Sequence, residues 1–428
     1  MTPDIVQLSD PAATDPQRFG PKAANQALLA AAGLPIPAGF CLGADAYCSQ
    51  LAALGLEQAA QRAVCLQGQA ARPFISKVRI GLFEGPITAA IREPLLKAWR
   101  DMVDASGALT VVRSSSLLED TDGLLFAGQF ESFLGLETEH DFLTAVKACW
   151  AALWSSRALK YMLAHELSPA DSAMALCIQP LVDARSAGGG MSRTADDNML
   201  LSATRGLGTA VAQGEVVPDR YLLNRAGELL EVTAGRTQHN VHCAHHGNRQ
   251  AAEKRTLNPH PEPCLGNAQA IELGQLMLCA ERVLQRPVEI EWALDEAGFK
   301  MLQARPLHME KAPEVDEIWS RRPALKGQPS GVGWAEGRSC VINCECELSR
   351  VAPGDVLVTK VAGPALSQVL PRVAGVVAEL GGSTSHLASL ARERSIPMVL
   401  GVLEATRKIP DGVQTGVDGV MGMVRWQY

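Results

Sequence analysis

The stretch Gly381-Gly-Ser-Thr-Ser-His386 constrains this chain more than any other, because an apolar run precedes it and an amphipathic run follows it. Residues 374–380 predict a strand, and the two glycines permit a tight exit from that strand. Ser383 or Thr384 can then cap a helix whose apolar side chains lie on one face. We therefore expect His386 in the first turn of that helix.

A histidine in the first turn of a helix faces the positive end of the helix dipole, which disfavours the imidazolium form and keeps the ring neutral near pH 7. A neutral imidazole is a nucleophile. The free N–H groups of the same turn can also bind an anion, so a phosphorylated His386 would be stabilised there. The alternative is an ordinary glycine turn and capped helix with an exposed histidine. These residues alone leave both interpretations open.

Together with Ala391-Arg-Glu393 and Ile396-Pro-Met-Val-Leu-Gly401, this stretch resembles the swivelling phosphohistidine domain of the phosphoenolpyruvate synthase, pyruvate phosphate dikinase and rifampin phosphotransferase family. The resemblance spans about residues 331–428. It implies that the histidine carries a phosphate. Leu387 and Ser389 depart from the family pattern, which usually has a small residue and an aliphatic one at these positions.

The composition is typical of a soluble globular protein, and 428 residues predict two or three domains. The net charge of -7 argues against nucleic acid or an anionic membrane surface as a partner. Neither a basic leader nor an apolar run of about 18 residues is present, so we expect a cytoplasmic location. The eleven cysteines lack a disulfide-like spacing, which indicates reduced thiols.

Near the N-terminus, residues 23–32 predict a helix that Gly33 stops, with Lys22 at its start. A lysine beside free N–H groups can hold a phosphate, although a solvated side chain is the common alternative. The surrounding Gly-Pro-Lys-Ala-Ala-Asn resembles the Gly-Gly-Lys-x-Ala-Asn opening of the same family's nucleotide domain, with Pro21 in place of the second glycine. The resemblance implies that Lys22 contacts the ATP phosphates.

A β-branched strand delivers Arg113 beside three serine hydroxyls, a combination that suits phosphate oxygens. A serine-rich surface loop is the alternative. The order Arg-Ser-Ser, Glu119-Asp120 and Phe126-Ala-Gly-Gln129 resembles the family's ATP site. It implies that Arg113 contacts phosphates, while Gly128 and Ser132 line the nucleotide pocket.

The apolar run 173–178 predicts a strand that leads to Gln179-Pro-Leu-Val182. This segment resembles the family's strand that binds adenine. The resemblance implies that Gln179 and the backbone of Leu181 form hydrogen bonds with the base.

Two glycine-rich stretches follow. Gly188-Gly-Gly190 predicts a flexible hairpin. Gly206-Leu-Gly208-Thr209, with Pro-Asp downstream, resembles the family's Gly-Leu-Gly-Glu lid region. Thr209 replaces the family's glutamate and the hairpin is shorter, and either change could relax closure over ATP.

Two strands close the predicted nucleotide domain, over residues 288–294 and 299–306. Alternation places Glu289 and Glu291 on one face, and Gln303 and Arg305 on one face of the partner strand. A carboxylate with an amide oxygen suits Mg2+, and an arginine suits phosphates, whereas a solvated charged hairpin is the alternative. The resemblance to the family's Ile-Glu-Trp-Ala and Leu-Gln-x-Arg-Pro implies that Glu291 and Gln303 bind the metal and that Arg305 contacts phosphates.

Five histidines and Cys243 crowd into residues 239–260. They could bind zinc or copper, but the surrounding proline, asparagine and glycine favour a surface loop, and the role stays open. Cys344-Glu-Cys346 is too close for a usual zinc knuckle and predicts a turn.

We thus expect an α/β protein. An ATP-grasp nucleotide-binding domain is predicted over residues 1–310, in two subdomains split near 185. A linker (311–330) and a small α/β swivelling phosphohistidine domain (331–428) follow, and the sequence leaves no room for the family's acceptor-binding domain. The resemblance implies that ATP with Mg2+ phosphorylates His386, giving AMP and inorganic phosphate. A hydroxylated small-molecule acceptor would then take the phosphate.

Two other functions remain open. The chain could be a phosphohistidine subunit that serves an acceptor site on a partner chain, as in phenylphosphate synthase systems, which it also resembles. It could instead be a regulatory ATP-binding protein that has lost turnover, which Thr209 and Leu387 permit.

Overall fold

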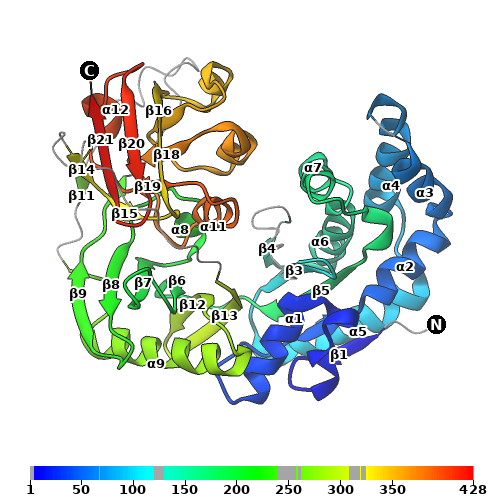
Figure 1. The fold of residues 1–428 in the computed structure, drawn as a ribbon. Helices are drawn as coiled ribbons and strands as arrows, with labels where there is room; N and C mark the ends of the chain where they lie inside the picture. The colour runs from blue at the N-terminus through cyan, green and yellow to red at the C-terminus, as the bar shows by residue number, and fades with distance from the viewer. Residues whose placement is uncertain are drawn as a thin grey trace. The chain divides into compact units, whose positions relative to one another are not determined.

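The computed structural model describes residues 4–66, 68–119, 130, 132–238, 257–258, 262–307, 319 and 324–427. They form a mixed α/β fold, which confirms the predicted class (Figure 1). The fold has two compact units, Met1–Asp183 with Lys300–Arg305, and Ala184–Phe299 with Pro306–Tyr428. Within the described ranges, no helix is both long enough and apolar enough to span a bilayer.

The first unit has a five-stranded sheet whose neighbours all pair antiparallel, in the order β1-β2-β5-β3-β4. Its strands are β1 (Ile5–Gln7), β2 (Phe40–Leu42), β3 (Thr110–Ser116), β4 (Ser132–Leu136) and β5 (Met174–Pro180). Its helices are α1 (Pro16–Ala31), α2 (Ala44–Ala53), α3 (Glu57–Cys65), α4 (Arg72–Glu84), α5 (Ala89–Ser106), α6 (Glu139–Ala152) and α7 (Ser156–Ala164).

Helix α1 is interrupted at Gly20, which has a φ of 73°. A Cβ at this position would lie 2.4 Å from Ser115 Oγ, so only glycine allows the helix to approach β3 this closely. Beyond the kink, Ala23 and Ala27 are buried in a core with Cys41 and Cys177. The helix thus starts again at the point where the sequence places Lys22.

The second unit contains a six-stranded sheet of order β13-β12-β6-β7-β8-β9, although the middle of β13 belongs to the first unit. Its strands are β6 (Ser186–Met191), β7 (Met199–Arg205), β8 (Asp219–Leu223), β9 (Leu229–Thr233), β12 (Val288–Asp295) and β13 (Gly298–Pro306). The accompanying helices are α8 (Thr209–Ala212) and α9 (Asn267–Leu284), and a short pair is formed by β10 (Thr237–Gln238) and β11 (Leu257–Asn258).

The predicted hairpin at Gly188–Gly190 is wrong, because these glycines lie inside β6 and pair with both β7 and β12. Their conformation is extended, and close packing explains why they are glycine. A Cβ on Gly188 would lie 1.9 Å from the carbonyl oxygen of Ser202. The glycines therefore let other groups approach the sheet.

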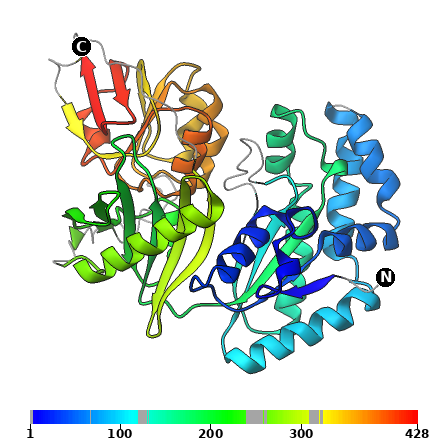
Figure 2. The same ribbon diagram turned by 60° about the horizontal axis from the view of Figure 1, so that its bottom comes forward.

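The second unit also contains an eight-stranded sheet of order β14-β21-β20-β16-β17-β18-β19-β15. Its strands are β14 (Ala324–Lys326), β15 (Gln328–Pro329), β16 (Trp334–Val341), β17 (Val356–Thr359), β18 (Gly375–Ala378), β19 (Met398–Leu400), β20 (Gln414–Asp418) and β21 (Met423–Gln427), and its helices are α11 (His386–Glu393) and α12 (Ala405–Lys408). The parallel strands from β16 to β19 are rich in buried valine, as expected for a sheet covered on both faces. The two red arrows in Figure 2 are β20 and β21, which pair antiparallel.

The end of the predicted linker is wrong, because Ala324–Pro329 is part of this sheet. β14 pairs with β21, whereas β15 pairs with β19 at the opposite end of the strand order. Only Gly327 separates them, and a Cβ there would lie 2.5 Å from the carbonyl oxygen of Leu400. One residue is too short to cross an open sheet, so the two ends of the strand order meet at Gly327, and the close approach to Leu400 there requires glycine.

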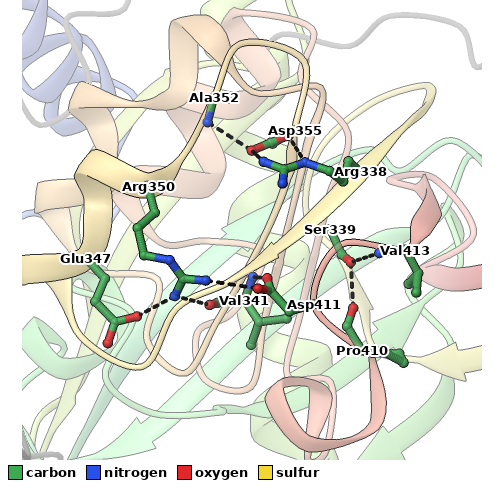
Figure 3. A network of polar contacts seen from close by, with 10 residues as sticks. All are labelled: Arg338, Ser339, Val341, Glu347, Arg350, Ala352, Asp355, Pro410, Asp411 and Val413. Carbon is green, nitrogen blue, oxygen red and sulfur yellow. Dashed lines mark hydrogen bonds and ion pairs between the residues drawn. The ribbon is translucent and has the colours of Figure 1, made fainter.

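Polar contacts fix the loops around β16 (Figure 3). Arg350 donates to Glu347, to the carbonyl oxygen of Val341 and to Asp411. Arg338 donates two hydrogen bonds to Asp355, at 3.1 and 2.9 Å. These contacts hold the small domain together without involving its histidine.

Candidate functional site

His386 is the first residue of α11, as the sequence predicts. The chain leaves β18 and turns at Gly381, which has a φ of 106°. The cap is Ser385, whose Oγ accepts a hydrogen bond from the N–H of Ala388 at 3.3 Å. The expected cap, Ser383 or Thr384, is therefore wrong.

The reason lies in what these two residues contact instead. Ser383 Oγ donates to the carbonyl oxygen of Pro329 at 2.7 Å. Thr384 faces Gly189 of β6, where a Cβ would lie only 2.7 Å from the Thr384 Cβ. The loop before His386 is therefore anchored on both sides, and the cap is made by the next residue.

The structure brings the loop before His386 to the face of the six-stranded sheet that carries Glu291. Glu291 and Gly189 are direct partners in the pairing of β12 with β6. Opposite residues of an antiparallel pair direct their side chains to the same face, and Thr384 approaches Gly189 on that face. The loop before the predicted phosphate carrier thus packs on the face of the sheet that carries the predicted metal ligand.

Glu289, two residues before Glu291, is buried against α11. Its carboxylate binds Arg392 at 2.9 Å and accepts hydrogen bonds from Ser389 Oγ at 2.8 and 2.9 Å. The sequence places Glu289 and Glu291 on one face but gives no indication of this contact, because its residues lie about a hundred positions apart. The departure of Ser389 from the family pattern was the only available signal.

In the first unit, Lys22 lies two residues after the kink in α1. Its Nζ contacts Glu119 Oε1 at 2.7 Å, and the lysine side chain is 19% exposed whereas the glutamate is fully buried. Glu119 Oε2 accepts the N–H of Ser116 at 3.0 Å. Ser115 Oγ accepts the N–H of Ala23 at 3.2 Å, at the start of the straight part of the helix. The lysine is therefore held at a helix start by Glu119, a residue of the resembling Glu119-Asp120 motif for which no contact was predicted.

Arg305 is the second cation at this carboxylate. Burial raises the pKa of the Glu119 carboxyl above its ordinary value, while the charges of Lys22 and Arg305 and its hydrogen bonds act in the opposite direction. Arg305 itself is 6% exposed. Lys22 and Arg305 thus both act on Glu119, and their contact with one polyphosphate stays a prediction.

Three other residues predicted for the ATP site, Arg113, Ser132 and Gln179, lie on the five-stranded sheet, and Leu181 directly follows its strand β5. Arg113 on β3 is the direct partner of Ser132 on β4. The amide of Gln179 donates to the carbonyl oxygen of Pro37 at 3.0 Å, and the N–H of Leu181 donates to Leu109 at 2.6 Å. These donors are therefore engaged within the protein, so an adenine that bound here would meet other groups of this strand.

For several predicted site residues, the structure does not show whether they lie close to the others. Gly128, Asp120 and the histidine cluster of residues 239–260 fall among the undescribed residues, apart from Leu257 and Asn258. Gln303 lies in the first unit and Glu291 in the second, so their pairing as metal ligands stays a prediction. The described residues contain no group of three or more His, Cys, Asp or Glu side chains arranged for a metal ion.

A glycine-kinked helix carrying a lysine beside a serine-rich strand, together with a small domain whose helix begins with histidine, defines an α/β protein that joins a nucleotide domain to a carrier domain. Residues 16–323 match the pyruvate phosphate dikinase AMP/ATP-binding domain, and residues 351–422 match the mobile domain of PEP-utilising enzymes. The chain belongs to the pyruvate phosphate dikinase AMP/ATP-binding domain family.

Curated relatives match almost the whole chain. A probable phosphoenolpyruvate synthase of Methanothermobacter thermautotrophicus is 29% identical over 95% of this chain and 61% of its own length. The phosphoenolpyruvate synthase of Aeropyrum pernix is 28% identical over 95% of this chain and 56% of its own length. The chain therefore spans a little more than half the length of these relatives.

Among solved structures, an Enzyme I protein (nEIt) is 30% identical over 19% of this chain and 33% of its own, with a TM-score of 0.18. That score is too low to indicate a shared overall fold.

Proposed function

We propose that this protein is an ATP-dependent phosphotransferase that phosphorylates its own His386 and passes the phosphate to a second substrate. The observation that carries the proposal is the position of His386, which begins α11 while its preceding loop packs on the sheet face of Glu291. The names of the relatives support the same class of reaction.

The proposed first step is attack by an imidazole nitrogen of His386 on the β-phosphorus of ATP. A nitrogen–phosphorus bond forms, the bond to the oxygen that bridges the α and β phosphates breaks, and AMP leaves. Water then cleaves the β–γ bond, which releases inorganic phosphate and leaves one phosphoryl group on the ring. A covalent intermediate divides the transfer into two steps that can occur at different places.

The chain's own side chains have the chemistry for the phosphates. Lys22, Arg113 and Arg305 would bind phosphate oxygens, since arginine forms charge-assisted pairs of hydrogen bonds with them. Glu291 and Gln303 offer the oxygen ligands that Mg2+ prefers, and when bound the ion would offset the negative charge of the phosphates. Gln179 lies on β5, the strand assigned to adenine, and Leu181 follows its end, while Ser132 with Gly128 would complete the pocket.

The names of the relatives make pyruvate and phosphoenolpyruvate the first pair to test as second substrate and product, as examples of a hydroxylated or enolic acceptor. The matched region leaves a large part of each relative outside this chain. An acceptor site on a partner chain is therefore the main rival. We place the reaction in the cytoplasm, where ATP is available.

The test is labelling with ATP that carries radioactive phosphorus in the β position. We expect an adduct that is labile in acid and stable in base, together with AMP, and His386→Ala should abolish both. His140→Ala is the matched control, because His140 is exposed and lies in the first turn of α6. Label retained in His386→Ala would overturn the assignment. ATP binding with neither label nor AMP in the unaltered protein would favour the regulatory function.

A further inference from the structure

The contact between β12 and α11 has no part in the chemistry proposed above. Glu289 on β12 is 5% exposed, while Ser389 and Arg392 on α11 are 1% and 6% exposed. The three side chains join the six-stranded sheet to the helix that His386 begins. Ser389 lies one turn after the histidine and Arg392 near the other end of the helix.

Each charged group in this contact has several partners. Glu289 Oε1 accepts from Arg392 Nη2 at 2.9 Å, and both carboxylate oxygens accept from Ser389 Oγ. Arg392 Nη1 donates to the carbonyl oxygens of Ser383, at 2.6 Å, and Ser330, at 3.3 Å. These bonds must all break before α11 can leave β12, and removing one partner by mutation would leave the other charge buried without compensation.

Other contacts show that this is an extended interface. The N–H of Gly381 donates to the carbonyl oxygen of Val216 at 3.1 Å. Arg236 Nη2 donates to the carbonyl oxygen of Gly401 at 2.7 Å. Residues before and after α11 are thus held by the same part of the chain that carries Glu289.

Ser389 makes the contact particular to this chain. The sequence departs here from the aliphatic residue usual in the resembling family, and an aliphatic side chain cannot donate a hydrogen bond. In this protein the hydroxyl donates to both oxygens of Glu289.

We propose that Glu289 is a positioning residue that keeps the carrier domain (residues 331–428) docked on the six-stranded sheet through Arg392 and Ser389. While the contact is intact, the His386 loop stays at the face of Glu291. Moving the histidine elsewhere requires the contact to break. The role in moving His386 rests on the proposed function, whereas the docking contact does not.

The test follows hydrogen exchange at single amides of the full chain. The Gly381 amide reports docking, because its acceptor, Val216, lies outside the carrier domain. The amides between β17 and β18 bond within the carrier domain and report its own stability. In Glu289→Gln we expect exchange at Gly381 to be about tenfold faster or more, with β17 and β18 unchanged. Ser389→Ala should increase the exchange rate at Gly381 less than Glu289→Gln does. Glu289→Asp, which keeps the charge, should give a rate between those of the two other variants.

Arg338→Gln is the matched control, because it removes an arginine from a pair with Asp355 inside the carrier domain. It should leave Gly381 unchanged. Unaltered exchange at Gly381 in both Glu289→Gln and Ser389→Ala would overturn the proposal. So would equal acceleration in β17 and β18, which would indicate general destabilisation. If Glu289→Gln does not fold, Ser389→Ala decides by the same criteria. Exchange needs no ATP, so its result is separate from the labelling test of His386.

Discussion

Two buried carboxylates, Glu119 in the first unit and Glu289 in the second, are each paired with a cation from another element. At Glu119 two cations act on one carboxylate, because Lys22 contacts it and the charge of Arg305 lowers its pKa. At Glu289 one guanidinium and one hydroxyl balance the carboxylate. Two cations at one carboxylate, one of them partly exposed, would suit an anionic ligand, whereas a fully buried contact between two elements indicates an interface.

Exposure supports the same distinction. The Lys22 side chain is 19% exposed, so a ligand could reach it, whereas Arg392 is 6% exposed and bonded to backbone carbonyls as well. A buried pair is weak support for stability in itself, and its surroundings decide what it does.

The largest effects are expected when one arginine is removed from each site, Arg305 beside Glu119 and Arg392 beside Glu289. Arg305→Ala should raise the barrier to AMP formation by about 2–4 kcal/mol, because a cation is lost from a polyphosphate site. Arg392→Ala should instead speed exchange at the Gly381 amide. Steady-state AMP release and hydrogen exchange, measured on both variants, check this. Unchanged AMP formation in Arg305→Ala would remove that residue from the phosphate site.

A smaller effect is expected when an added methyl group, rather than the loss of a charge, disturbs the contact between β6 and the loop before His386. In Gly189→Ala the new Cβ would lie 2.7 Å from Thr384 Cβ, and overpacking of this kind costs about 1–3 kcal/mol. Exchange at the Gly381 amide should become faster. AMP formation in the first minutes should fall less than it does in Arg305→Ala. Gly266→Ala is the control, since nothing lies closer than 3.8 Å to its Cβ. Identical exchange in the two variants would show that Thr384 can move away without cost.

The smallest expected effect is on how the stability of the fold depends on pH. Burial is the largest influence on Glu119 and its pKa is raised above 4.5, so the folded protein binds this proton more tightly than the unfolded chain does. Stability from this group is therefore greatest below 4.5 and falls as pH rises from 4.5 to the raised pKa, above which it is constant. Glu119→Gln should remove that fall. Urea unfolding of both proteins at several pH values tests it, and parallel pH profiles would contradict it.

The sequence predicted those features that depend on neighbours in the chain. His386 lies in a first turn, and strands cover residues 288–295 and 298–306, close to the predicted ranges. Each depends on local periodicity or on a glycine stop, which the sequence displays directly.

The errors came from residues whose conformation is decided by distant parts of the chain. Gly188–Gly190 reads as a turn by composition, yet neighbouring strands and the Thr384 loop need its lack of side chains. Ser383 lost the cap because Pro329, more than fifty residues away, accepts its hydrogen bond. The sequence does not distinguish Glu289 from Glu291, and only the fold shows that Glu289 is the one that pairs with Arg392.

The position of β14 and β15 at the two ends of the strand order of the eight-stranded sheet has a consequence for how the protein folds. Ala324 pairs with Arg425, so this first segment of the small sheet must wait for one of its last strands. Closing so long a loop is entropically costly, and topologies rich in such pairings fold slowly. During synthesis the sheet can be completed only after β21 has left the ribosome. Until then, the edge of β20 on which β21 pairs remains open to pairing with other chains.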